Sequence, residues 1–153
     1  SVNASSAFMS DFTGSNKYTI TPRHTDKKLD LYQGSKNDGT TLQIYESQPG
    51  NPNQEFVFAD VGNDEYLILN LGTGTYMTAN SETDAPVSGN LLPPVDQRVR
   101  WKVVPVRGGS GAYNLYSVAY PDLVMDIFRA GTDNETPVVL WTNNGEQNQQ
   151  FFL

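Results

Sequence analysis

Cysteine is absent from this chain of 153 residues, and histidine occurs once. The lack of cysteine excludes disulfide bonds, thiol nucleophiles and cysteine-based metal sites. The single histidine, His24, stands in a polar segment that predicts a solvated turn. With this one histidine and no cysteine, the sequence offers no usual catalytic triad or zinc site. We therefore expect no catalytic residue, no metal ligand and no cofactor.

Positive charge and long apolar runs are also scarce. Ten Lys and Arg residues stand against 17 Asp and Glu residues, giving a formal net charge of −7. Nucleic acids and anionic membrane surfaces need a basic face, so neither is an expected partner. No apolar run approaches the roughly 18 residues that a membrane-spanning helix requires. Insertion into a membrane is therefore not expected.

Glycine and proline, by contrast, are plentiful and spread along the chain, with 13 and 9 residues respectively. This distribution is typical of a fold with many short strands and turns. Several segments alternate apolar and polar residues, whereas a helical period of 3.6 residues never persists over three turns. The length suits one domain with one core. The sequence therefore predicts a single all-β domain.

One segment recurs near the C-terminus at nearly the same spacing. Its first copy contains LDLY with Asp30, LQIY with Gln43 and Tyr45, and the closing NQEF that ends at Phe56. The second copy contains MDIF with Asp126, VVLW with Trp141, and NQQF that ends at Phe151. A mixed pattern repeated at nearly fixed spacing indicates a structural unit that is used more than once.

The opening and closing strands divide the chain into three such units. We place the repeats at about residues 18–58, 65–104 and 113–153, after an N-terminal extension of residues 1–17. Each repeat opens on a tyrosine in an alternating segment, beginning with Tyr18-Thr19-Ile20. The closing aromatics Phe56, Trp101 and Phe151 are expected to fill a shared core. Three prolines in residues 85–97 are expected to limit strand pairing there.

Three units that close on Gln-x-aromatic resemble the ricin-B type β-trefoil lectins. Their Q-x-W motif is seen here as Gln54-Glu55-Phe56 and Gln149-Gln150-Phe151, and Trp101 alone remains of it in the middle repeat. The segments EYLILNLGTGTYMTANS and VRWKVV are similar to cysteine-free fungal members. The resemblance implies a β-trefoil with pseudo-threefold symmetry, built from three repeats of four short strands.

The resemblance also implies shallow sites for galactose or N-acetylgalactosamine, one for each competent repeat. The implied carbohydrate-binding residues are Asp30, Gln43, Tyr45 and Asn53, with Gln54 behind them, and Asp126, Trp141 and Asn148, with Gln149 behind them. Val139 replaces the glutamine of the third repeat. In the second repeat, Thr78 replaces the Asp and Arg98-Val99 replaces Asn-Gln, so that repeat is interpreted as structural only.

These residue types suit a hexose. A carboxylate accepts hydrogen bonds from two adjacent hydroxyls, and an Asn amide both donates and accepts. A flat aromatic side chain covers the C–H face of the sugar. Strand alternation places Tyr45 and Trp141 one register from Ile44 and Leu140 and therefore away from the core. The simpler interpretation of Asp30 is that it braces the nearby hairpin.

Three alternatives stay open. An enzyme is disfavoured because Asp30 and Asp126 belong to different repeats, whereas glycoside hydrolysis needs carboxylates roughly 5–10 Å apart. A protein-binding trefoil, such as a protease inhibitor, would act through the loops at residues 85–97 or 107–111. The chain could also be the sugar-targeting module of a longer enzyme or toxin.

The expected partners are glycans and glycoproteins that carry galactose or N-acetylgalactosamine. By resemblance, we also expect a homodimer and a cytoplasmic location, with secretion as the alternative.

Overall fold

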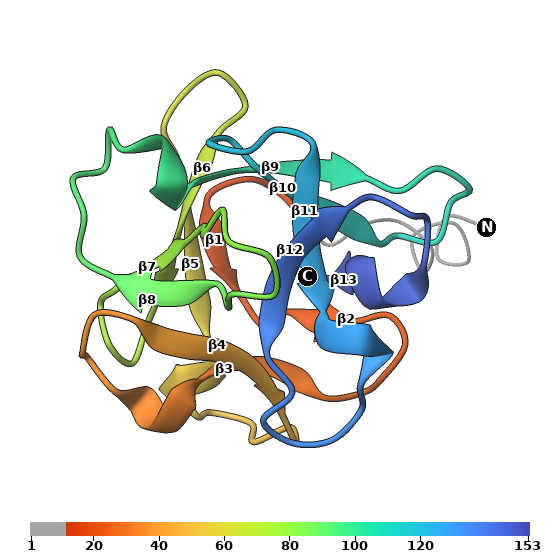
Figure 1. Cartoon of the computed structure of the whole chain (residues 1–153), viewed down its shortest axis with the longest axis horizontal. Coiled ribbons are helices and arrows are strands. Elements are labelled where there is room, and N and C mark those ends of the chain that lie inside the picture. Colours follow the sequence, from red (N-terminus) through yellow and green to blue (C-terminus); the bar gives the residue numbers. More distant parts are fainter. Residues whose placement is uncertain (1–11) are drawn as a thin grey trace.

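The computed structural model describes residues 12–153 (Figure 1), so residues 1–11 of the predicted N-terminal extension lie outside the described residues. The strands are β1 (Asn16–Tyr18), β2 (Thr21–Pro22), β3 (Lys28–Leu31), β4 (Thr40–Tyr45), β5 (Phe56–Asp60), β6 (Tyr66–Asn70), β7 (Tyr76–Thr78), β8 (Ser88–Asn90), β9 (Arg100–Pro105), β10 (Tyr113–Ser117), β11 (Leu123–Ile127), β12 (Val138–Thr142) and β13 (Phe151–Phe152). Five short 3-10 turns complete the secondary structure, namely η1 (Tyr32–Gly34), η2 (Pro52–Gln54), η3 (Gln97–Val99), η4 (Phe128–Ala130) and η5 (Gln147–Gln149). The described residues contain no α-helix. None of the 3-10 turns among them is long and apolar enough to cross a bilayer.

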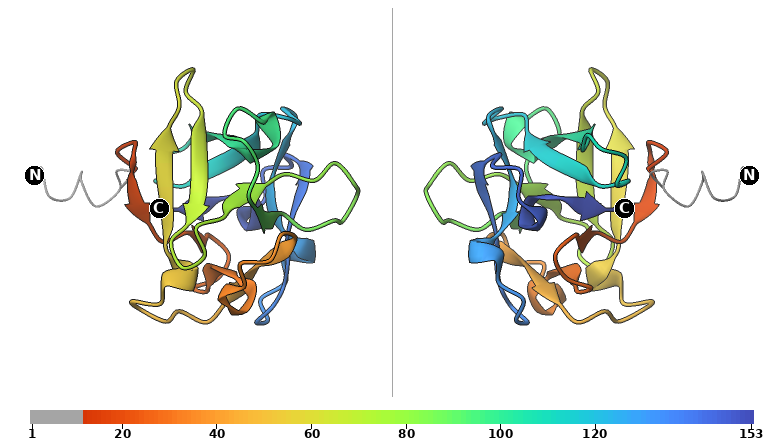
Figure 2. Two further views of the ribbon diagram at one scale, coloured as in Figure 1. Left: turned by 90° about the vertical axis from the view of Figure 1, so that its left-hand side faces the viewer. Right: turned by 90° about the vertical axis from the view of Figure 1, so that its right-hand side faces the viewer.

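The first and last strands of the repeats close into a barrel. Antiparallel pairs run from β1 to β5, β6, β9, β10 and β13 in turn, and β13 returns to β2, which follows β1 in the chain. In Figure 2 the red strand β1 lies beside the yellow strand β5 at one side of this barrel. The predicted β-trefoil with three repeats is confirmed, and each repeat contributes four strands, with β2 as an additional short strand.

The two inner strands of each repeat form hairpins, β3–β4, β7–β8 and β11–β12. The hairpins are joined to one another as well. Strand β4 pairs with β8 through Thr40 and Thr41, while isolated bridges link Gln43 with Pro137 and Pro86 with Val139. The three hairpins therefore form a connected array, and this array positions the candidate site.

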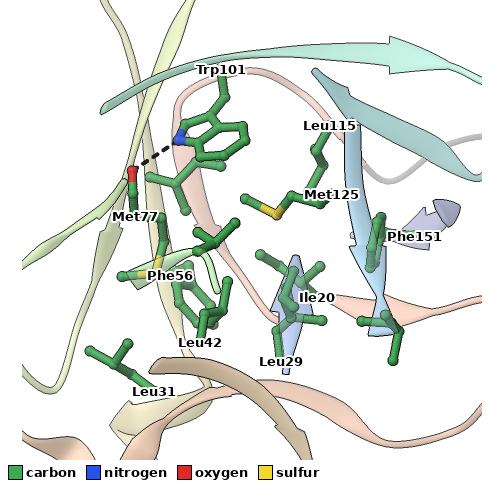
Figure 3. Packing of buried hydrophobic residues seen from close by; sticks show 14 of the residues in the cluster. Ile20, Leu29, Leu31, Leu42, Phe56, Met77, Trp101, Leu115, Met125 and Phe151 are labelled. Atoms are coloured by element: carbon green, nitrogen blue, oxygen red, sulfur yellow. Dashed lines mark hydrogen bonds between the residues drawn. The ribbon is translucent and has the colours of Figure 1, made fainter. Parts of the chain in front are cut away.

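The closing aromatics lie in the core, as predicted. Phe56, Trp101 and Phe151 are fully buried, and they surround the same apolar centre as Leu42 and Met125 in Figure 3. The Trp101 indole Nε1 donates a hydrogen bond of 3.0 Å to the Met77 carbonyl. Burying side chains of this size contributes about 1.5–3 kcal/mol each. One closing aromatic per repeat thus stabilises the threefold centre.

An aromatic cluster anchors the chain just before β1. Phe12, which belongs to the predicted extension, packs on Tyr18, Phe58 and Tyr66 with ring centroids 5.2–5.7 Å apart. The Tyr18 hydroxyl donates to the Gly14 carbonyl at 2.8 Å. Strand β1 begins at Asn16, so it starts before the predicted first residue of the trefoil.

One local prediction is wrong and another holds only in part. Residues 18–20 are not one strand, because β1 ends at Tyr18 and the Ile20 carbonyl accepts a hydrogen bond from the Leu29 amide at 2.9 Å where the chain turns from the barrel toward its hairpin. The proline-rich residues 85–97 contain strand β8, which pairs with both β7 and β4. Its three residues contain no proline, so their amides remain available for pairing.

Replacing the core tryptophan tests the threefold centre. We expect Trp101→Phe to lower the free energy of unfolding by about 2–4 kcal/mol, because it opens a cavity and leaves the Met77 carbonyl without its donor. Urea denaturation provides the measurement. Trp141→Phe is the control and should change the stability by less than about 0.5 kcal/mol, since that side chain is 45% exposed. Equal stability losses in the two variants would contradict this account of the core.

Candidate functional site

The first repeat has a cleft of about 240 Å³ at the side of its hairpin. The cleft brings together four of the five site residues predicted in this repeat, Asp30, Gln43, Tyr45 and Asn53, and it is also lined by Tyr32, Gln33, Gln48, Asn51 and Glu135. Gln54 lies behind this surface and is 2% exposed. The β3–β4 register creates the cluster, because it places Asp30 opposite Gln43.

A glutamine amide holds the carboxylate of this cleft. Gln54 Nε2 donates to Asp30 Oδ2 at 3.0 Å and to the Glu46 carbonyl at 2.9 Å. Gln54 Oε1 accepts from the Gln48 amide at 2.9 Å. A second, longer bond runs from Gln43 Nε2 to Asp30 Oδ1 at 3.4 Å. The Gln54 side chain therefore fixes both the buried carboxylate and the loop that leads into the closing turn.

The third repeat has a cleft of about 370 Å³ with the same construction. It brings together Asp126, Trp141 and Asn148, and it is also lined by Asp84, Phe128, Arg129, Ala130, Val139, Asn144 and Glu146. Gln149 is fully buried behind them. Its Nε2 donates to Asp126 Oδ2 at 2.8 Å and to the Thr142 carbonyl at 2.9 Å, while its Oε1 accepts from the Asn144 amide at 2.9 Å.

The two asparagines differ in their contacts. Asn148 Nδ2 donates to Asp126 Oδ1 at 3.2 Å and to the Ile127 carbonyl at 3.1 Å. Asn53 makes no side-chain hydrogen bond within residues 12–153, and it lies against Gly34. A Cβ at Gly34 would stand 2.5 Å from Asn53 Oδ1, so only glycine leaves room there. The first cleft thus presents an amide that is free to bind a ligand.

Aromatic side chains flank both carboxylates. Trp141 is 45% exposed and Tyr45 is half-buried, whereas their neighbours Leu140 and Ile44 are buried, as strand alternation predicts. The sequence interpretation missed Tyr32 and Phe128, which follow the second strand of their repeats and line the clefts. The repeated LDLY and MDIF already contained them at matching positions. That repetition is the signal that could have identified them.

Burial changes the acidity of both carboxylates. Desolvation raises the pKa of Asp30 above its ordinary value, while hydrogen bonds from Gln54 and Gln43 oppose the rise. Desolvation likewise raises the pKa of Asp126 against the bonds from Gln149 and Asn148. When the pKa of a carboxyl group is higher in the folded than in the unfolded protein, the group stabilises the fold at pH values below the unfolded-state pKa. This stabilisation is lost as the pH rises through the folded-state pKa. At neutral pH both groups therefore cost stability.

The second repeat has a cleft of about 400 Å³ without a carboxylate among its lining residues. The residues at the matching positions are Thr78, Ser88, Asn90 and Arg98. Their polar groups are paired within the protein, because Asn90 Nδ2 donates to Ser88 Oγ at 2.9 Å and Thr78 Oγ1 donates to the Tyr76 carbonyl at 3.0 Å. Hydrogen bonds from Arg98 lower the pKa of Asp96 to about 2, so the guanidinium is paired as well.

His24 lies in a turn, as predicted, but its side chain is not simply solvated. His24 is half-buried, its Nε2 lies 2.9 Å from the Gly131 carbonyl, and its Nδ1 is buried without a hydrogen-bond partner among residues 12–153. The ring connects the first repeat to the loop after η4 of the third, a contact that sequence spacing does not reveal. Within the same described range, no group of three or more His, Cys, Asp or Glu side chains could hold a metal ion.

Comparison with known proteins identifies relatives of this architecture. The sequence profile of the ricin-type beta-trefoil lectin domain-like family matches residues 52–141, which is more than half of the chain. The crystal structure of the Rhizoctonia solani agglutinin is 25% identical, with a TM-score of 0.81 over 92% of this chain and 95% of that chain. A search of curated protein sequences finds no match.

Two further structures share the fold. The designed threefold-symmetric protein ThreeFoil is 23% identical, with a TM-score of 0.80 over 89% of this chain and 96% of that chain. The Macrolepiota procera ricin B-like lectin in complex with lactose is 17% identical, with a TM-score of 0.74 over 94% of this chain and 97% of that chain.

Removing the glutamine behind the first cleft tests the carboxylate clamp. We expect Gln54→Leu to lower the free energy of unfolding by about 3 kcal/mol at pH 7, because Asp30 loses its shorter donor and remains buried. The deficit should shrink at acidic pH, where Asp30 is protonated and needs that donor less. Stability measured at both pH values tests this, with the exposed Gln97→Leu as the control. A pH-independent deficit would argue against the clamp.

Proposed function

The chain belongs to the ricin-type β-trefoil lectin domain-like family, and we propose that it binds glycans ending in galactose or N-acetylgalactosamine through the clefts of its first and third repeats. The observation that carries the proposal is the repeated clamp of a buried carboxylate by a buried amide, beside an outward-facing aromatic, at Asp30 and again at Asp126. The lactose complex of the Macrolepiota procera lectin supports a galactose-containing ligand.

In the first cleft, each of the five predicted residues has its own role in binding the sugar. Asp30 accepts hydrogen bonds from two adjacent hydroxyls, and the free amide of Asn53 both donates and accepts. Tyr45 covers the C–H face of the ring. Gln43 adds a donor beside the carboxylate, and Gln54 keeps that carboxylate in place. Galactose suits this arrangement because its axial hydroxyl leaves one C–H face unobstructed.

The third cleft repeats this scheme with fewer free donors, because Asn148 Nδ2 already donates to Asp126 and to the Ile127 carbonyl. Asp126 and Asn148 supply the polar contacts, Trp141 supplies the aromatic surface, and Gln149 holds Asp126 from behind. Val139, which is buried and pairs with Asp126 across the β11–β12 hairpin, cannot make the hydrogen bond that Gln43 offers in the first cleft. We therefore assign the primary site to the first repeat and a weaker or differently selective site to the third.

Affinity for a multivalent glycan arises from several shallow sites together. One such site gives millimolar affinity for a monosaccharide, on the order of −4 kcal/mol. Two sites per chain, or four in a homodimer, raise the avidity by making the second binding event intramolecular. We therefore propose a homodimer that agglutinates glycoprotein-bearing surfaces, acting in the cytoplasm, with secretion as the alternative. Cysteine-free fungal lectins are the proposed relatives within the family.

We propose a binding role without catalysis for this chain. Asp30 and Asp126 cannot act as one catalytic pair, because they line separate clefts and no lining residue is common to both. Incubation with lactose tests this point. Lactose should remain intact, and release of free galactose that is lost in an Asp30→Asn or Asp126→Asn variant would identify a glycosidase.

The second candidate is a protein-binding trefoil. Leu91 and Val95 in the loop of residues 85–97 are 63% and 77% exposed, and exposed apolar side chains of a loop suit a protein partner. The two candidates can be distinguished, because protease inhibition would not require the hydrogen bonds between Gln and Asp in the clefts. Loss of protease inhibition in a Leu91→Ser/Val95→Ser variant, with no glycan binding by the native chain, would favour this candidate.

A glycan array read beside isosteric variants tests the proposal. Wild-type protein should bind glycans with terminal galactose or N-acetylgalactosamine, and Asp30→Asn should weaken that binding about tenfold or more, because charge-assisted hydrogen bonds are lost. Asp126→Asn should have a smaller effect on monovalent ligands. Asp122→Asn, which removes an exposed carboxylate outside the clefts, is the control. Unchanged binding by both site variants would refute the assignment of the clefts.

Binding should also depend on acidic pH in a defined direction. The carboxylate form accepts the sugar hydroxyls, and burial raises the pKa of Asp30 above its ordinary value. Affinity for lactose should therefore fall as the pH drops, with a midpoint above the ordinary Asp value of about 3.9. Calorimetric titration between pH 7 and 3.5, under conditions where circular dichroism shows the protein folded, gives the midpoint. A midpoint below the ordinary value would contradict a buried carboxylate ligand.

A further inference from the structure

The three hairpins contact one another in the same register. In each hairpin, one residue lies directly opposite the Asp or Thr of the other strand. This residue is Gln43 in the first repeat, Ser88 in the second and Val139 in the third. Gln43 pairs with Pro137 of the third repeat and Val139 pairs with Pro86 of the second, while Ser88 pairs with Thr41 of the first. The same position of every repeat thus meets the hairpin of a different repeat.

The neighbouring hairpin also contributes a lining residue to each cleft. In every case this residue stands two positions before Pro137, Pro86 or Thr41 in the chain. Glu135 lines the first-repeat cleft, Asp84 lines the third-repeat cleft, and Gly39 lines the second-repeat cleft. All three residues have a positive φ, of 70°, 62° and 89° respectively. They are therefore equivalent turn positions, each belonging to one repeat and facing the cleft of another.

Two of these three turns carry a side chain although their backbone conformation suits glycine best. A positive φ suits glycine, and for a residue such as Glu it is uncommon and costs energy. Gly39 shows that this turn forms with glycine. The two clefts with a buried Asp carry a carboxylate at this turn, whereas the cleft that lacks the Asp carries none. In this chain, the turn carboxylates therefore occur together with the buried Asp.

Hydrogen bonds to the first repeat fix the turn that carries Glu135. The Glu135 amide donates to the Ile44 carbonyl at 2.8 Å, and the Ile44 amide donates to the Thr136 carbonyl at 2.9 Å. The Glu46 amide donates to Asn134 Oδ1 at 2.9 Å. The Glu135 and Asp84 side chains are exposed, and within residues 12–153 neither carboxylate has a hydrogen bond or ion pair. Both are therefore free to interact with a ligand.

We propose that Glu135 and Asp84 are specificity-determining residues, supplied across the repeat boundaries to the first and third sites, and that they select uncharged glycans over anionic ones. This inference rests on the proposed function, because it names the ligand class of the same sites. The buried Asp receives the terminal sugar at the floor of each cleft, and the exposed carboxylate at the rim faces the sugar unit linked to it. Hydroxyls of that unit donate to the rim carboxylate, whereas a carboxylate or sulfate there is repelled.

The charges of the clefts agree with this selection. The charged lining residues of the first cleft are Asp30 and Glu135, both acidic. Those of the third are Asp84, Asp126 and Glu146 against the single Arg129. Two like charges several ångströms apart at a protein surface repel each other, and salt weakens the repulsion. An anionic group at the rim is therefore disfavoured in both sites.

Lactitol and lactobionate form a matched pair of probes. Both carry a terminal galactose on an open-chain C6 unit, and only lactobionate has a carboxylate on that unit. Calorimetry at low salt should show that wild-type protein binds lactobionate about threefold or more weakly than lactitol. In Glu135→Gln/Asp84→Asn the two affinities should become nearly equal. The control Glu82→Gln/Asp133→Asn has the same net charge and removes exposed carboxylates of the same two hairpins, so it should keep the wild-type ratio.

The outcomes separate this inference from the proposed function. Equal affinity of the wild-type protein for both probes, or the same ratio in the two double variants, would overturn the role of Glu135 and Asp84 while leaving galactose binding intact. Failure of the wild-type protein to bind lactitol, together with a blank glycan array, would instead overturn the proposed function. Unchanged melting temperatures of the two double variants would show that the substitutions act on binding and not on folding.

Discussion

The candidate sites depend on one interaction, the hydrogen bond from a buried glutamine amide to a buried aspartate. Gln54 makes it to Asp30 and Gln149 makes it to Asp126, and in both cases the same amide also binds the loop before the closing turn. Burial would by itself drive these carboxyls toward the neutral form, so the donors keep an acceptor at the floor of the cleft. The second repeat has lost both partners together, with Thr78 and Val99 in their places.

The barrel and the hairpin array position the glutamine and the aspartate of this hydrogen bond. The closing turn that carries each glutamine leads directly into a strand whose first residues include a core aromatic, so the core fixes where the amide lies. The hairpins then share backbone pairing at equivalent positions, which brings the turn of one repeat to the cleft of the next. Each site is therefore a property of two repeats and not of one.

The sequence predicted the parts of the molecule that depend on local periodicity. Alternation placed Tyr45 and Trp141 outside the core, and the repeated spacing identified the three units and the closing aromatics. It could not predict Glu135 and Asp84 at the clefts, because their position depends on pairing between hairpins far apart in the chain. The contact of His24 with Gly131 was missed for the same reason, because it joins distant parts of the chain. The turn at Ile20 was missed for another reason, since the chain leaves the barrel there to enter its hairpin.

The most direct test of the central account is an NMR titration with lactose that follows the two tryptophan indole signals and the amide of Tyr45. Trp141 lines the third cleft, whereas Trp101 is fully buried in the core and bound to Met77, so the two indoles serve as probe and internal reference. The account predicts that the Tyr45 and Trp141 signals shift with saturation while the Trp101 signal stays in place. A titration that leaves both Tyr45 and Trp141 unchanged would contradict it.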